Sequence, residues 1–109
     1  MGKKHFHTRA IHVGNIPDSE TGAVSVPLHL TSTYEQDKVG IHKGFDYSRA
    51  GNPTRSCFEE NIASLESGKY GISFASGMAA ITALFQTLKQ GDHVIIGRNV
   101  YGGTYRMAV

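Results

Sequence analysis

A short apolar run that leads directly into a helical pattern constrains the fold of this chain more than any other feature. The run covers residues 72–75 and ends a segment, 70–75, that reads as a strand. Ser76 and Gly77 follow at once, and the apolar residues beyond them recur at helical spacing, at Met78, Ile81, Leu84, Phe85 and Leu88. The sequence therefore predicts that a strand turns into a helix at Ser76-Gly77.

This predicted turn has the chemistry of an anion site. The first backbone amides of a helix have no partner within the helix, and they lie at the positive end of its dipole. Gly77 has no Cβ, so a phosphate can approach its backbone closely, and Ser76 is either the N-cap or a hydroxyl ligand of the anion. On these two residues alone, an ordinary capped turn between strand and helix is the simpler interpretation.

Two further stretches offer groups that suit a phosphate and a flat ring. Tyr47 and Arg49 stand two residues apart, and an arginine fork binds phosphate oxygens through two hydrogen bonds. Tyr101 precedes Gly102-Gly103, just beyond a second apolar run at residues 93–96 where a strand should end. An aromatic ring at that point can cover a flat cofactor, whereas Tyr101 taken alone reads as a surface tyrosine at a turn.

The order and spacing of these stretches resemble the Cys/Met-metabolism family of pyridoxal-5′-phosphate (PLP) enzymes. The stretches are Tyr47 to Thr54, Phe74 to Ala79 and Val100 to Thr104, and the resemblance extends back to Thr8. It implies an α/β fold, namely the N-terminal part of a fold type I PLP-dependent transferase. The family's enzymes are several times longer than this sequence, so the chain resembles an N-terminal fragment.

The resemblance implies a role for each of these residues. The backbone at Gly77 and Met78 would hold the PLP phosphate, and Tyr101 would stack on the pyridine ring and take part in proton transfer. Tyr47 and Arg49 would bind the phosphate in the active site of a neighbouring subunit, so that a dimer is the catalytic unit of a homotetramer. We accordingly expect Tyr47 and Arg49 to lie far from Gly77 within one chain.

The implied activity is trans-sulfuration of a small sulfur amino acid. The first expectation is a cystathionine γ-lyase, which cleaves a C–S bond to give cysteine, 2-oxobutanoate and ammonia. Cystathionine γ-synthase, cystathionine β-lyase, methionine γ-lyase and O-acetylhomoserine sulfhydrylase activities stay open, and so does a non-catalytic interaction module. In the family, the lysine that forms a Schiff base with PLP lies beyond residue 109, and none of the six lysines here has its context. We therefore expect the chain alone to be inactive.

The remaining pattern predicts an N-terminal arm, residues 1–47, and the beginning of a PLP-binding domain, residues 48–109. Asn52 and Pro53 are a good N-cap and first residue for a helix with an apolar stripe, which Gly68 would close. A strand at 70–75, a helix at 77–90 and a strand at 93–97 then form a βαβ unit of a parallel sheet, and a further helix could start after Thr104. We expect the segment before Gly44 to make few contacts with this unit.

Composition excludes several other classes. A net charge of +2 without a run of basic residues argues against nucleic-acid or acidic-membrane partners. The chain's one cysteine, Cys57, reads as a small buried thiol, and the scattered histidines lack metal-ligand spacing, so no metal is expected. P-loop and dinucleotide motifs are missing from the sequence. Neither a signal peptide nor a membrane-length apolar run is visible, which favours the cytoplasm.

Overall fold

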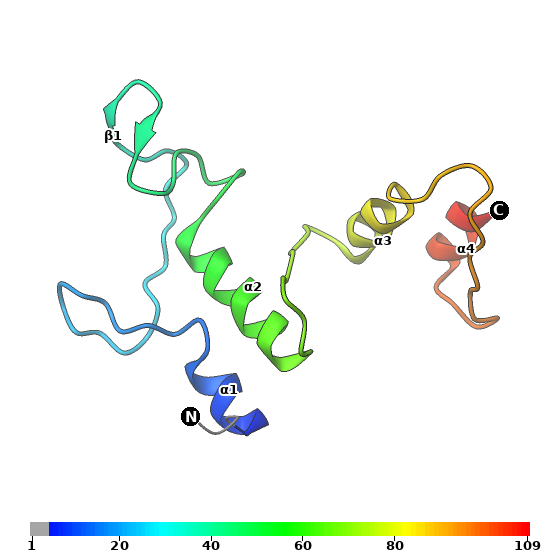
Figure 1. Ribbon diagram of the computed structural model, residues 1–109, viewed down its shortest axis with the longest axis horizontal. Coiled ribbons are helices and arrows are strands. Elements are labelled where there is room, and N and C mark those ends of the chain that lie inside the picture. Colours follow the sequence, from blue (N-terminus) through cyan, green and yellow to red (C-terminus); the bar gives the residue numbers. More distant parts are fainter. Residues whose placement is uncertain (1–4) are drawn as a thin grey trace. The chain divides into compact units, whose positions relative to one another are not determined.

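The computed structural model of the chain describes residues 5–109, so the first four residues of the predicted arm lie outside the described residues. Contacts divide the chain into a first unit, Met1–Ile72, and a second unit, Ser73–Val109. The helices and strands follow in the order α1 (Phe6–His12), β1 (Gln36–Lys38), β2 (Ile41–His42), α2 (Pro53–Leu65), α3 (Gly77–Phe85) and α4 (Gly102–Ala108), as Figure 1 shows. Among residues 5–109, no helix is long and apolar enough to cross a membrane.

Helix α2 is the main element of the first unit, and it begins where the sequence predicts. The side chain of Asn52 accepts hydrogen bonds from the amides of Thr54 and Arg55, at 2.9 and 3.4 Å, and Pro53 is the first helical residue. The end of the helix differs from the prediction that Gly68 closes it. Ser67 takes the left-handed conformation instead, with φ of 57°, while the Gly68 amide donates to the Ala63 carbonyl at 2.8 Å.

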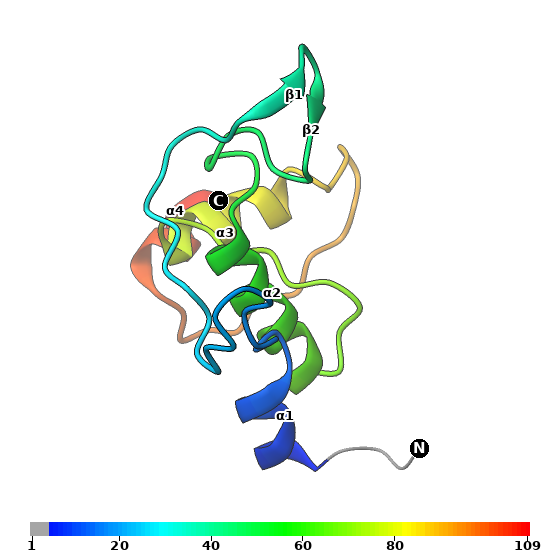
Figure 2. The ribbon, with the colours of Figure 1, turned by 90° about the vertical axis from the view of Figure 1, so that its left-hand side faces the viewer.

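Helix α1 lies against α2, as both ribbon views show (Figure 1 and Figure 2). The Asn61 amide group on α2 donates to the carbonyls of Arg9, Ala10 and Val13, at 3.2, 3.1 and 2.7 Å. These bonds lie at the end of α1, where helical carbonyls run out of partners within the helix, although the Arg9 carbonyl also accepts from the Val13 amide at 3.0 Å. The Arg9 guanidinium donates in return to the carbonyl of Ser64. The predicted arm thus contains a helix that is anchored on α2, which the sequence pattern did not indicate.

Two glycines lie directly against the backbone of α2. A Cβ at Gly14 would overlap the carbonyl of Cys57, and the backbone of Gly14 is also left-handed, with φ of 77°. A Cβ at Gly71 would overlap the carbonyl of Glu59 in the same way. At both positions a side chain of any size would push the chain away from the helix.

A second stretch of the arm runs along the start of α2. Thr54 Oγ1 donates to the Pro27 carbonyl at 2.8 Å and accepts from the His29 amide at 3.0 Å, and Asn52 Nδ2 donates to the His29 carbonyl at 2.9 Å. Farther along the chain, β1 and β2 pair in antiparallel register, with Gln36 opposite His42 and an irregularity before Lys38. This hairpin is exposed on all its residues.

In the second unit, α3 and α4 pack on each other. Helix α3 ends at Phe85, five residues before the predicted end at Gln90. The Thr87 hydroxyl donates to the Leu84 carbonyl at 2.7 Å, and the amides of Thr87 and Leu88 donate to carbonyls three residues back in place of four. These bonds replace the helical ones and end the helix. Helix α4 begins at Gly102 rather than after Thr104. The Thr82 hydroxyl of α3 lies 3.6 Å from the Met107 sulfur of α4.

The βαβ prediction is correct for its helix and wrong for its two strands in this chain. Residues 70–75 and 93–97 have no regular secondary structure, and the sheet found among residues 5–109 is the β1–β2 pair. Parallel strands are stable when neighbours bond to them and helices cover their faces. Here Ile72 and Ile95 are 74% and 91% exposed. The apolar residues of these runs are typical of strands, but a strand forms only where another strand bonds to it, and no segment of residues 5–109 does so here.

Candidate functional site

The start of α3 is an open set of backbone donors. Ser76 is its N-cap: the backbone is extended, and Oγ accepts a hydrogen bond from the Ala79 amide at 3.2 Å. The first backbone bond of the helix runs from Ala80 to the Ser76 carbonyl, at 3.1 Å. The amides of Gly77 and Met78 therefore precede the intrahelical bonds and remain available to a ligand. A Cβ built at Gly77 would meet no atom within 4 Å, so the approach is clear.

Gly103, near the start of α4, lies beside the side chains of Met78 and Tyr101. A Cβ at Gly103 would lie 2.7 Å from both the Met78 sulfur and Cε1 of the Tyr101 ring. The absence of a side chain at Gly103 thus leaves room for both groups. Tyr101 itself is 70% exposed, so one face of its ring is free to stack on a planar group. The second unit accordingly holds the predicted phosphate donors and the predicted stacking residue.

Tyr47 and Arg49 lie together in the first unit. The Arg49 guanidinium is 5.1 Å from the centroid of the Tyr47 ring, which is a cation–π distance. Arg49 is exposed, and within the described residues no carboxylate forms an ion pair with it. The Tyr47 carbonyl accepts hydrogen bonds from the amides of Ala50 and Gly51, both at 2.9 Å, so these residues form a tight turn. The expected separation of this pair from Gly77 stays a prediction.

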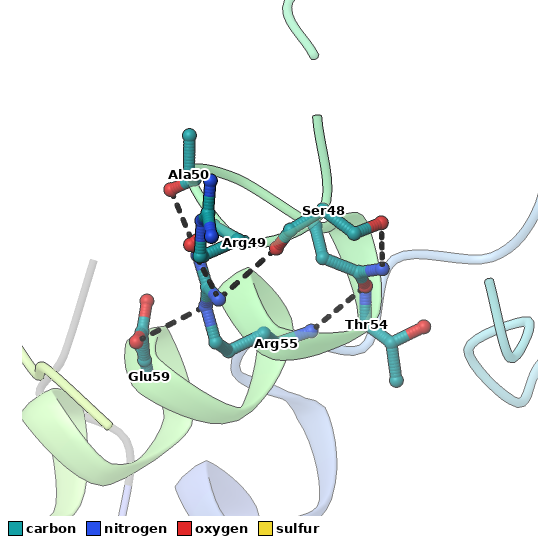
Figure 3. A network of polar contacts seen from close by, with 7 residues as sticks. Ser48, Arg49, Ala50, Thr54, Arg55 and Glu59 are labelled. Atoms are coloured by element: carbon teal, nitrogen blue, oxygen red, sulfur yellow. Dashed lines mark hydrogen bonds and ion pairs between the residues drawn. The ribbon is translucent and has the colours of Figure 1, made fainter. Parts of the chain in front are cut away.

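One residue next to this turn escaped the sequence analysis. The Arg55 guanidinium, in the first turn of α2, donates to the carbonyls of Ser48, Arg49 and Ala50 (Figure 3). An arginine shortly after an N-cap is common, and backbone carbonyls carry no sequence signal. The only hint was the offset of five to seven residues between Arg55 and a turn already suspected of binding phosphate.

Two side chains outside these groups have shifted pKa values. Burial, and then the charge of Glu60, raises the pKa of the Cys57 thiol, which is consistent with a protonated structural cysteine. Hydrogen bonds from the Thr21 hydroxyl and amide lower the pKa of the exposed Asp18 carboxyl. Among residues 5–109, no three His, Cys, Asp or Glu side chains gather as a metal site would require.

Each unit by itself offers groups that suit a phosphate-bearing aromatic cofactor. In the second unit these are backbone donors with a clear approach, and in the first unit an exposed arginine that forms no ion pair with a carboxylate of residues 5–109. An exposed tyrosine ring suits a planar heterocycle. The five predicted site residues are therefore chemically suited to PLP.

Known proteins resemble this chain over nearly its whole length. Residues 7–109 match the family described as Cys/Met metabolism PLP-dependent enzyme. The chain is 56% identical to a probable cystathionine γ-synthase of Herpetosiphon aurantiacus, over 94% of this chain and 32% of that protein. It is 50% identical to the cystathionine β-lyase of Coxiella burnetii, over 96% of this chain and 27% of that protein.

A solved structure agrees with these relatives. The chain matches the crystal structure of cystathionine γ-lyase from Lactobacillus plantarum, complexed with L-serine, with a TM-score of 0.84 and 48% sequence identity. The match covers 96% of this chain and 27% of that one. The chain thus spans between about a quarter and a third of the length of the proteins that it resembles.

Proposed function

Because the chain belongs to the Cys/Met metabolism PLP-dependent enzyme family, we propose that the full-length protein containing it cleaves a C–S bond of a sulfur amino acid. Membership confirms the predicted cofactor, PLP, and the fold type I α/β class. The observation that supports the function is the match over residues 7–109, which includes all five site residues. With it we propose the division into an arm, 1–47, and the beginning of the PLP-binding domain, 48–109.

The proposed roles follow from the chemistry of each group. The amides of Gly77 and Met78 donate to the phosphate, and Arg49 and Tyr47 bind the phosphate of a neighbouring subunit. Tyr101 stacks on the pyridine ring, and its phenol carries a proton between substrate and solvent. PLP, when bound, supplies an electron sink for the negative charge that develops at the substrate's α-carbon. The protein's part is to hold the ring and phosphate rigidly.

The specific reaction that we propose is that of a cystathionine γ-lyase. Cystathionine and water give cysteine, 2-oxobutanoate and ammonia, with cleavage of the bond between sulfur and the γ-carbon. Relatives named for γ-reactions, among them the Herpetosiphon aurantiacus protein and the Lactobacillus plantarum structure, support chemistry at that carbon, although other relatives are named as β-lyases. The second candidate is cystathionine γ-synthase, because a relative of that name has 56% identity.

The test is a product analysis of the full-length protein loaded with PLP. With cystathionine as substrate, we expect cysteine and 2-oxobutanoate, identified by mass spectrometry. Homocysteine and pyruvate would instead identify a β-lyase. Formation of cystathionine from cysteine and an activated homoserine ester, faster than its breakdown, would favour the γ-synthase. Absence of any turnover of sulfur amino acids, with PLP bound, would contradict the proposed enzyme.

The proposal extends to assembly and setting. We propose a dimer as the catalytic unit within a homotetramer in the cytoplasm, because Tyr47 and Arg49 are assigned to a neighbour's phosphate. A protein consisting of residues 1–109 should be inactive on its own. Mixing an Arg49→Ala subunit with a subunit that lacks its own phosphate donors should restore one functional site per dimer. Failure of every such mixture to regain activity would argue against the shared site.

A further inference from the structure

We propose that Arg55 is a positioning residue that fixes the turn at residues 48–50 and so directs the Arg49 side chain toward the cofactor's phosphate. The inference rests on the proposed function, since it assumes that Arg49 binds phosphate. It adds a residue that the resemblance did not assign and that acts through Arg49 without touching the cofactor.

The contacts of Arg55 concentrate on one short stretch of backbone (Figure 3). Its Nη1 atom donates to the carbonyls of Ser48 and Arg49, at 3.1 and 3.2 Å, and its Nη2 atom donates to the Ala50 carbonyl at 2.8 Å. Three successive carbonyl oxygens therefore point at a single guanidinium. This group suits the task because it is planar, always charged and carries five donors in a fixed arrangement.

Holding these carbonyls fixes the direction of the Arg49 side chain. The Ser48 carbonyl belongs to the peptide plane before the Arg49 Cα, and the Arg49 carbonyl belongs to the plane after it. Peptide units are rigid, so a residue whose two flanking planes are held has fixed φ and ψ. The bond from Cα to Cβ then has one direction. Arg55 thereby removes backbone freedom that Arg49 would otherwise lose only when it binds phosphate.

Glu59 balances the charge of Arg55. Its Nε atom lies 3.7 Å from Glu59 Oε1, one turn along α2, and the two side chains are 34% and 23% exposed. With its donors directed at carbonyls and a carboxylate, Arg55 is occupied within its own helix and turn. Arg49 has no such carboxylate among the described residues, so it is the arginine of the pair that is available to an anion.

The turn has a second support, which limits the effect expected from removing Arg55. Asn52 Nδ2 donates to Ser48 Oγ at 3.1 Å, and the Ser48 amide donates to the Ser32 carbonyl at 2.9 Å. Both contacts hold Ser48. The Ala50 amide, which shares a peptide plane with the Arg49 carbonyl, donates to the Tyr47 carbonyl at 2.9 Å, so this plane keeps one bond without Arg55. Loss of Arg55 should therefore loosen the turn at Arg49 without unfolding it or the chain around it.

The experiment measures affinity for two forms of the cofactor in the full-length protein prepared without PLP. Dissociation constants for PLP and for pyridoxal, which lacks the phosphate, are determined by titration for Arg55→Gln, Arg49→Ala and the double variant. Glu60→Gln, an exposed charge change on the same helix, is the control. Thermal unfolding of each protein without PLP is recorded alongside.

The positioning role predicts a specific pattern. Arg49→Ala should weaken PLP binding on the order of 10- to 100-fold, because a charge-assisted contact to phosphate is lost. Arg55→Gln should weaken it about fivefold, and the double variant should bind PLP no more weakly than Arg49→Ala alone. Pyridoxal affinity should be the same in all variants. Arg55→Lys keeps the charge but cannot span three carbonyls, so it should recover only part of the loss.

Other results would overturn the inference in distinguishable ways. Arg55→Gln could weaken the binding of PLP and pyridoxal equally, or its loss of PLP affinity could add in full to that of Arg49→Ala in the double variant. Either result would mean that Arg55 supports the fold in general and does not position Arg49. If Arg55→Gln does not fold, Arg55→Lys takes its place. Equal weakening of PLP and pyridoxal binding in Arg55→Lys leads to the same conclusion, whereas weakening of PLP binding alone supports the positioning role. If Arg49→Ala itself leaves PLP affinity unchanged, the proposed phosphate contact is wrong, and the inference falls with it.

Discussion

Helices α2 and α3 both begin at a polar N-cap after an irregular segment, yet the surroundings of the two starts differ. At α2, side chains of Asn52 and Thr54 bond to backbone of residues 27–29, and Arg55 closes the turn before the helix. At α3, Ser76 makes its cap bond, and a Cβ at Gly77 would meet no atom within 4 Å beyond its neighbours in the chain and helix. A polar N-cap thus connects α2 to the preceding chain, whereas at α3 it leaves backbone amides open to a ligand.

Substitution of Tyr101 should give the largest effect, and it tests whether the open start of α3 belongs to a reacting site. Tyr101→Phe keeps the ring, so the full-length protein should retain its bound PLP and its visible absorbance after dialysis. Turnover of cystathionine should fall on the order of 100-fold, because a positioned proton carrier is lost. The measurement is the steady-state release of 2-oxo acid. Turnover at the parent rate would remove Tyr101 from proton transfer.

Removal of the N-cap should lower the free energy of unfolding more at α2 than at α3. Asn52→Ala loses the cap and the bonds to His29 and Ser48, so the free energy of unfolding should fall by about 2 kcal/mol. Ser76→Ala loses one cap bond at an exposed position and should cost about 1 kcal/mol. Urea unfolding of the PLP-free full-length protein measures both, with exposed Ser56→Ala as the control. Equal losses would mean that the two starts are not built differently.

A methyl group at Gly77 should separate binding from stability. Gly77→Ala meets no atom of the chain, so the PLP-free protein should be at least as stable as the parent. If the phosphate binds this backbone as proposed, the methyl group would enter the space that it needs, and PLP affinity should fall about tenfold, roughly 1.4 kcal/mol. Titration with PLP and thermal unfolding give the two values. Unchanged affinity would show that phosphate does not approach this residue.

The smallest effect concerns two left-handed residues that follow the helices. Ser67 comes directly after the C-cap of α2, whereas Gly91, with φ of 97°, lies in the loop beyond α3, which ends at Phe85. A side chain in this conformation costs free energy that glycine does not incur. Ser67→Gly should therefore raise the free energy of unfolding by about 0.5–1 kcal/mol, while Gly91→Ala should lower it. A destabilised Ser67→Gly protein would contradict the left-handed conformation.

The difference between these regions also shows what sequence reasoning can reach. Both N-caps follow from local rules, and the structure confirms Asn52 and Ser76 in that role. Ser67 was overlooked because the glycine next to it fits the usual signal for a helix end. The strands at 70–75 and 93–97 depend on partners that no local pattern contains. Asn61 bonds to backbone carbonyls 48 to 52 residues away, and Arg55 bonds to carbonyls five to seven residues away. Every residue offers such a carbonyl, so neither contact has a sequence signal.

The site residues show the same contrast between what the sequence predicts and what only the structure shows. The resemblance to the family, which rests on motif order and spacing, assigned Tyr47, Arg49, Gly77, Met78 and Tyr101. The structure then shows what supports them: a cation–π pair, an open helix start and the gap at Gly103. Their contact with PLP is a proposal, since it depends on cofactor and subunits together.

The contact of Gly14 and Gly71 with α2 bears on how variants of this protein should be interpreted. Neither glycine belongs to the proposed site, but each lies where a methyl group would collide with a carbonyl of the helix that carries Arg55. An alanine at either position would displace the chain around α2 and so disturb Arg49 indirectly. Such a variant would lose PLP and be mistaken for a cofactor-site mutant. Added PLP would then restore activity only in proportion to the fraction of molecules that fold.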